Sequence, residues 1–101
     1  MKILVLTKDV PEVPGERFTK ELLKEEAWHA WGLQQSGVFR EMYFRADGDS
    51  AVLMLECASV DEARAVLSGL PLVREGLIDF DIIPLIAYPG FARLFGQEER
   101  A

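Results

Sequence analysis

The sequence has few of the residues that build disulfides and metal centres. Among its 101 residues there is one cysteine, Cys57, and one histidine, His29. A single thiol cannot form an internal disulfide, and metal sites need several Cys, His or carboxylate ligands at defined spacings. No glycine-rich phosphate loop or nucleophile elbow is present either. We therefore expect no metal and no organic cofactor.

Basic residues and long apolar runs are also scarce. Eleven Lys and Arg are scattered among seventeen Asp and Glu, which gives a net charge of -6. Nucleic-acid binding needs a basic stripe, so no nucleic-acid partner is expected. No stretch approaches the roughly 20 apolar residues of a membrane span, and the apolar run at the start is too short for a signal peptide. The expectation is a cytoplasmic protein without a membrane partner.

The remaining composition is that of a globular domain. Half of the residues are hydrophobic and 28% are charged, a balance that argues against disorder. The length allows one domain, residues 1–101, with a C-terminal tail at 89–101. Phe91, Leu94 and Phe95 make the tail too apolar to stay in water, so we expect it to dock on its own or a neighbouring subunit and to close part of the pocket.

Apolar runs alternate with helical stretches in the order β-α-β-β-α-β. The predicted strands cover 3–7, 38–45, 50–57 and 77–88, and the predicted helices cover 16–35 and 59–70. Asp47-Gly48 between two apolar runs is a strong hairpin signal. Ser59 followed by Glu62 is a capping box, Pro71 is expected to end the second helix, and Pro84 indicates an edge strand or a bulge.

This order predicts an α+β fold of the ferredoxin-like type, with a four-stranded antiparallel sheet and two helices on one face. Both faces of the strands are nevertheless apolar, since Leu4 and Met54 alternate with residues such as Ile3 and Leu53. A sheet with one wet face normally alternates apolar and polar residues. A second copy is the simplest cover, which indicates a homodimer or higher homo-oligomer. The alternative is that the apolar residues only reflect strand propensity.

The first helix carries the candidate proton-transfer groups. Glu26 and His29 lie three residues apart on a mostly apolar arc, so that their side chains can meet. Such a pair can donate and accept protons, or it can be a structural hydrogen bond. Trp31 is on the same arc, whereas Trp28 points outward, as an oligomer contact or a platform for a ligand.

The second strand carries the candidate binding groups. Strict alternation places Phe39 and Tyr43 on one face and Arg40 on the other, among apolar neighbours. A buried Arg needs a carboxylate. That partner is either Asp79 or Asp81 of the last strand, or the carboxylate of a substrate.

Several segments resemble one known family. They are Gln34-Gln35-Ser36-Gly37-Val38-Phe39-Arg40, the helix start Ser59-Val60-Asp61-Glu62-Ala63, Leu70-Pro71-Leu72, Ile78-Asp79-Phe80-Asp81 and Pro84-Leu85. Over more than half of its length the chain is thus similar to the muconolactone isomerase-like group of the dimeric α+β barrel superfamily.

The resemblance implies a barrel made by two sheets, with a small-molecule pocket between sheet and helices. It also implies a cofactor-independent isomerase that moves a proton on an unsaturated lactone. Arg40 matches a basic position of the family's second strand, whereas Glu41 stands where the family has a histidine.

We consider two main functions. An isomerase acting on a small carboxylated ring compound would use Glu26 and His29 as catalytic residues and Arg40 for the substrate, all in one pocket. A non-catalytic ligand-binding or accessory module would line its pocket with aromatic residues, Trp31, Phe39, Tyr43 and Phe80. The accessory alternative is supported by Val73-Arg74-Glu75-Gly76-Leu77, which resembles the YCII-like proteins. Trp28 and Trp31 also leave a likeness to cofactor-free monooxygenases open. A purely structural role is the third possible function.

The apolar second face leads to a first prediction. The purified protein should be at least a dimer, with an interface above roughly 1,000 Å², and Leu4→Asp or Met54→Asp should break the assembly or the fold by burying an unpaired charge. Analytical ultracentrifugation at micromolar concentration checks this. A monomeric natural sequence would contradict the prediction.

Overall fold

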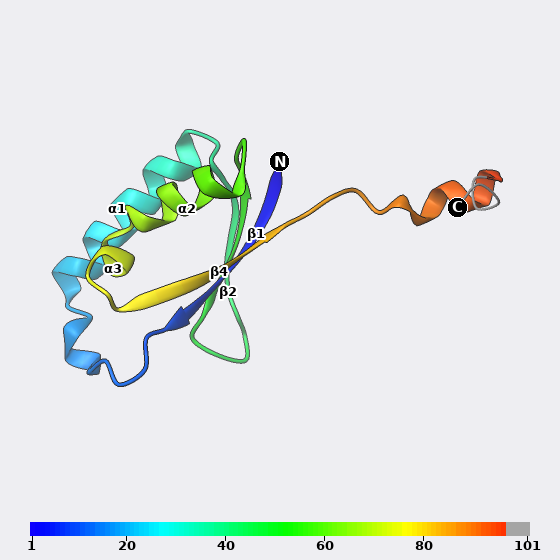
Figure 1. Cartoon of the computed structure of the whole chain (residues 1–101). Coiled ribbons are helices and arrows are strands. Elements are labelled where there is room, and N and C mark those ends of the chain that lie inside the picture. Colours follow the sequence, from blue (N-terminus) through cyan, green and yellow to red (C-terminus); the bar gives the residue numbers. More distant parts are fainter. Residues whose placement is uncertain (97–101) are drawn as a thin grey trace.

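A four-stranded antiparallel sheet forms one layer and the helices form a second layer on one of its faces (Figure 1). The computed structural model describes residues 1–96. The elements are β1 (Lys2–Asp9), η1 (Gly15–Arg17), α1 (Lys20–Gln35), β2 (Phe39–Phe44), β3 (Ala51–Glu56), α2 (Val60–Ser68), α3 (Pro71–Arg74), β4 (Ile78–Pro84) and η2 (Pro89–Phe95). The strand order β2-β3-β1-β4 confirms the predicted ferredoxin-like fold.

The ends of α1 are set by local chemistry. Thr19 Oγ1 accepts a hydrogen bond from the Leu22 backbone N–H at 3.1 Å, so the helix begins at Lys20. The predicted start at residue 16 was therefore too early, because 15–17 form a separate 3-10 turn. Gly37, with φ 86°, follows the helix in the left-handed conformation that glycine adopts without strain.

The second helical region is divided into two. Ser59 Oγ accepts from the Glu62 N–H at 3.1 Å, and the Glu62 carboxylate accepts from the Ala58 N–H at 2.9 Å, as the predicted capping box requires. Pro71 does not end α2, which ends at Ser68. It begins α3 instead, because the first position of a helix needs no N–H donor.

The core lies between α2 and the helix-facing side of the sheet. Ile3 and Val5 of β1 are buried there beside Leu55 of β3 and Leu67 of α2. No residue of α1 itself, Lys20–Gln35, is buried. The longest helix therefore stands partly away from the sheet and roofs a space over it.

The opposite face of the sheet carries an apolar strip. Leu4 is paired with Met54 on one side and with Ile83 on the other, and Leu6 is paired with Val52. Helices α1, α2 and α3 lie on the other face, and the chain after β4 projects away from the sheet (Figure 1), so none of these helices covers the strip. The prediction that both faces are apolar is confirmed.

Strand β4 lies at an edge of the sheet and ends at Pro84, which agrees with the edge position that this proline predicted. The predicted continuation of the strand to residue 88 was wrong, because the chain leaves the sheet there. Residues 85–96, called the arm below, project away from the body (Figure 1). The radius of gyration is accordingly 17.0 Å, against about 13 Å for a compact chain of this length. Residues 97–101 of the predicted tail lie outside the described residues.

The capping box supplies a stability test. Ser59→Ala should lower the free energy of unfolding by about 1 kcal/mol, because the Glu62 N–H loses its acceptor. Ser68→Ala, at the other end of α2, is the matched control, since its hydroxyl only bonds the Arg64 carbonyl, a bond that slightly destabilises helices. Urea unfolding of both variants measures the difference. Equal losses would contradict the role of the cap.

Candidate functional site

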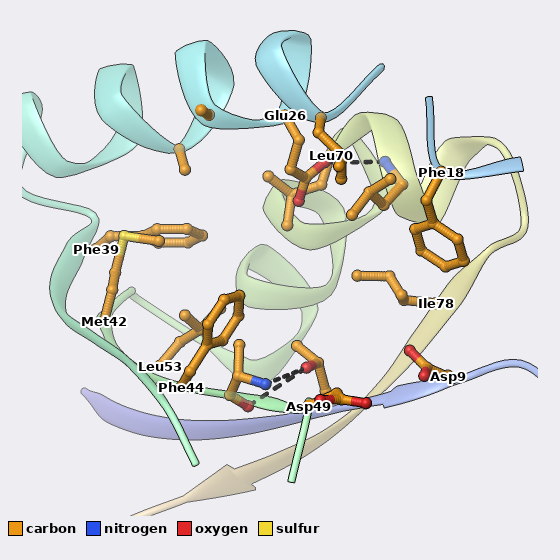
Figure 2. A pocket seen from close by; sticks show the side chains of 16 residues that line it. Asp9, Phe18, Glu26, Phe39, Met42, Phe44, Asp49, Leu53, Leu70 and Ile78 are labelled. Carbon is orange, nitrogen blue, oxygen red and sulfur yellow. Dashed lines mark hydrogen bonds between the residues drawn. The ribbon is translucent and has the colours of Figure 1, made fainter. Parts of the chain in front are cut away.

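A cavity of about 520 Å³ lies between α1 and the helix-facing side of the sheet (Figure 2). It is at the end of the sheet where β1 finishes and β4 begins, and every layer of the fold contributes to its wall. The lining residues are Thr7, Asp9, Phe18, Leu23, Glu26, Ala27, Ala30, Phe39, Met42, Phe44, Asp49, Ala51, Leu53, Leu70, Leu72 and Ile78.

The wall is mostly apolar, with a few acidic groups. Phe18, Phe39 and Phe44 present three aromatic rings to the space (Figure 2). The ionisable groups among the lining residues are all carboxylates, from Asp9, Glu26 and Asp49, and no Lys, Arg or His belongs to this set. Apolar walls with a few placed polar groups are typical of small-molecule sites.

Glu26 is the half-buried acid of the cavity. It extends from α1 toward α3, and its Oε1 accepts a hydrogen bond from the Leu72 backbone N–H at 2.9 Å. Leu72 is in the first turn of α3, where N–H groups have no partner within the helix. No partner of the second oxygen, Oε2, occurs among the described residues, so this oxygen can interact with a bound molecule.

Burial sets the protonation of Glu26. Loss of solvation is the main cause that raises the pKa of this carboxyl above its ordinary value of 4.5. The hydrogen bond from Leu72 and the charges of His29 and Arg74 lower the pKa and offset part of this effect. A carboxyl whose pKa is raised by burial in an apolar cavity has the environment of groups that exchange protons with a bound molecule.

His29 lies one turn further along α1, outside the cavity lining, and its side chain is exposed. It points toward the end of α2, because a methyl group placed on Gly69 would lie 3.7 Å from His29 Nε2. It is near enough to affect the pKa of Glu26. The predicted pair is thus close, but one member faces the cavity and the other faces solvent.

Arg40 does not meet the partners that the sequence indicated. Its Nε donates a hydrogen bond to the Gly37 carbonyl at 2.5 Å, and the side chain is exposed. Strands β2 and β4 are at opposite edges of the sheet, so neither Asp79 nor Asp81 can pair with it. Asp81 instead pairs with Lys8 at 3.0 Å.

A β-bulge at Arg40 explains why strict alternation failed in β2. Phe39 pairs with Leu55 and Glu41 pairs with Met54, so one residue of β2 has no counterpart on β3. Phe39 therefore shares the cavity face with Met42 and Phe44. Tyr43 lies on the opposite face and donates to Glu41 at 2.8 Å, which corrects the expectation that Phe39 and Tyr43 share a face.

The other two predicted aromatic residues lie outside the cavity. Trp31 is exposed and lines a shallow surface depression with Trp28 and Lys24, and Phe80 packs half-buried against the core. The structure thus brings Glu26 and Phe39 together in the cavity and leaves the other five predicted site residues outside it. The sequence analysis did not predict Phe18, Met42 and Phe44 as residues of the site. Because Met42 and Phe44 are apolar and two positions apart on a strand, they could have been predicted to line the same face.

Solved structures similar to this chain share its fold, whereas searches with the sequence find no match. No family model and no curated protein matches the sequence. Among solved structures, a muconolactone isomerase is similar with 23% identity and a TM-score of 0.69, over 88% of this chain and 92% of that chain. The 5-chloro-2-hydroxyhydroquinone dehydrochlorinase TftG of Burkholderia phenoliruptrix AC1100, in complex with 2,5-dihydroxybenzoquinone, is similar with 18% identity and a TM-score of 0.61, over 89% and 98%.

These likenesses confirm the resemblance that the sequence indicated, at the level of the fold. The chain has the α+β fold of the muconolactone isomerase-like group. Within residues 1–96 no cluster of three His, Cys or carboxylate side chains could hold a metal ion, and no helix there is long and apolar enough to cross a membrane.

The raised pKa of Glu26 predicts a pH dependence of stability. Because folding favours the protonated form, Glu26 contributes stability below pH 4.5 that is lost as the pH rises through its folded-state pKa. Glu26→Gln can keep the oxygen that accepts from Leu72 and does not titrate. The unfolding free energy of the natural protein should therefore fall relative to Glu26→Gln as pH rises above 4.5, measured by urea unfolding at several pH values. If the unfolding free energy of the natural protein relative to Glu26→Gln stays constant or rises with pH, burial does not control the pKa of Glu26.

Proposed function

We propose that this protein binds a small, oxygenated ring compound in the cavity between α1 and the sheet, and that Glu26 moves a proton on the bound molecule. The observation that carries the proposal is the half-buried carboxyl with a raised pKa, surrounded by apolar and aromatic side chains. The cavity volume, about 520 Å³, is in the range of small-molecule sites.

The chemistry follows from the position of the carboxylate. A carbon next to a ring carbonyl carries an acidic C–H. Glu26 takes this proton through Oε2 as the C–H electron pair moves into an enolate, and the protonated Glu26 then returns the proton to another carbon of the conjugated system. The bond changes balance without an oxidant or reductant. General acid–base catalysis of this kind contributes about 10²–10⁴-fold in rate.

The folds of an isomerase and a dehydrochlorinase support this reaction class. The second of these holds a hydroxylated quinone, a flat oxygenated ring. Three aromatic rings in the cavity wall here suit a flat ligand of that type.

In this proposal His29 acts through Glu26. Its charge lowers the pKa of the Glu26 carboxyl, so it keeps the group available as a base without touching the substrate. Arg40, Trp31 and Tyr43 have no role in the cavity of a single copy. Tyr43 lies on the open face of the sheet beside Val52, and we propose that this face packs against a second copy to form a homodimer.

A binding module without chemistry is the second candidate, and one observation favours it. The hydrogen bond from Leu72 to Glu26 caps the start of α3, so this carboxylate also has a structural duty. In that case the cavity still binds an apolar ring compound, and no proton moves.

Proton exchange separates the two candidates before the substrate is known. In D₂O the protein should speed deuterium incorporation next to the carbonyl of unsaturated lactones or cyclic enones, as followed by NMR. Glu26→Gln should lower that rate by about 10²–10⁴-fold with the fold retained, and His29→Gln should lower it less. Exchange that is equally fast with Glu26→Gln would favour the binding module.

A further inference from the structure

The charges in the wall of the cavity are all of one sign. Asp9, Glu26 and Asp49 are carboxylates, and no Lys, Arg or His is among the lining residues. Arg40, which the sequence suggested as the anchor of a substrate carboxylate, is exposed outside this wall. A carboxylate bound against the described wall meets negative charge with no cation to offset it, and bringing like charges together costs free energy.

Asp9 and Asp49 lie on the same side of the cavity. Thr7 and Asp9 are two positions apart on β1, so their side chains point to the same face of the sheet. The Thr7 hydroxyl bonds the backbone of Ala51 on β3, and Asp49 precedes Ala51 by two residues. Figure 2 shows both aspartates at the sheet side of the cavity, across the space from Glu26, which extends from α1.

The two aspartates are available to a bound molecule. Both side chains are exposed, and within residues 1–96 neither is in an ion pair or accepts a hydrogen bond. Asp47 and Asp81, by contrast, are paired with Arg45 and Lys8. A carboxylate without a protein partner accepts strong hydrogen bonds from the hydroxyl groups of a ligand.

Hydrogen-bond donors are scarce in the same wall. Thr7 carries the one side-chain donor among the lining residues. Its oxygen accepts from the Ala51 N–H at 2.7 Å and lies 3.4 Å from the Ala51 carbonyl oxygen, which is long for a bond between a hydroxyl and an oxygen. The lining side chains thus offer three carboxylates and one hydroxyl. A ligand that matches this wall supplies hydrogen-bond donors and has no negative charge of its own.

We propose that the cavity selects an uncharged ring compound with hydroxyl groups and excludes a carboxylated one, and that Asp9 and Asp49 make this selection. The ring hydroxyls donate to the two aspartates, and the ring lies against Phe39 and Phe44. The opposite edge of the ring then faces Glu26. This inference rests on the proposed function in that the cavity binds an oxygenated ring compound, and it does not need proton transfer by Glu26.

Two catechols that differ in one substituent test the selection. One carries a hydroxymethyl group and the other a carboxylate at the same ring position, so that only the second is an anion at neutral pH. In isothermal titration calorimetry at low salt, the carboxylated catechol should bind the natural protein about tenfold more weakly, because like charges repel. Benzyl alcohol, which lacks the ring hydroxyls, should bind about tenfold more weakly than the hydroxymethyl catechol.

The outcomes separate this inference from the proposed function. If the carboxylated catechol binds as well as the hydroxymethyl catechol or better, the selection is overturned, although the cavity still binds a ring compound. If neither catechol binds, the proposed function of the cavity fails, and the selection fails with it. Affinity is measured without turnover, so a loss of proton exchange in Glu26→Gln is a separate result.

Variants assign the selection to the two aspartates. Asp9→Asn and Asp49→Asn preserve the size of each side chain and remove its charge, so the double variant should bind the carboxylated catechol about tenfold better than the natural protein does. Asp61→Asn, at the start of α2 and outside the wall, is the control for the change in net charge and should leave this affinity unchanged. If the double variant gains no more affinity than the control, Asp9 and Asp49 do not make the selection.

Discussion

A hydrogen bond between the Glu26 carboxylate and the Leu72 N–H joins the longest helix to the short helix beside the cavity. Helix α1 has no fully buried residue in Lys20–Gln35, and its contacts with the core come from the half-buried Ala30 and Leu33. An exposed ion pair between Glu25 and Arg74, at 2.9 Å, joins the same two helices, but such pairs contribute little. The acid that we propose as the proton-transfer group therefore also helps to hold the roof of the cavity. The hydrogen bond gives this carboxylate a polar partner in an otherwise mostly apolar wall.

The arrangement has a consequence for the whole molecule. Because α1 packs on the core only through Ala30 and Leu33, a space remains between this helix and the sheet. The protein exposes apolar surface at the open edge of this cavity, on the strip around Leu4 and Met54, and along the arm. Soluble monomers rarely expose this much contiguous apolar surface. In our proposals a ligand binds in the cavity and a second copy covers the open sheet face, and both rest on burial that a single chain leaves incomplete.

Much of the fold was predictable because it follows from local patterns. The hairpin at Asp47-Gly48, the cap at Ser59 and the edge position signalled by Pro84 are each determined by a few neighbouring residues. The errors have local causes as well. Pro71 begins a helix instead of ending one, and a bulge at Arg40 moves every later residue of β2 to the other face. A bulge involves two strands, so it cannot be recognised from one strand's alternation of residue types.

Residue type and spacing were enough to predict the order of the main strands and helices, the apolar character of both sheet faces and the carboxylate on the inner arc of the first helix. Only the three-dimensional structure reveals that Glu26 meets the first turn of α3, that Arg40 lies at the opposite edge of the sheet from Asp79 and Asp81, and that residues 85–96 leave the sheet. Each of these depends on the distance between segments far apart in the chain. Such distances follow from how the layers pack, and no periodicity in the sequence records them.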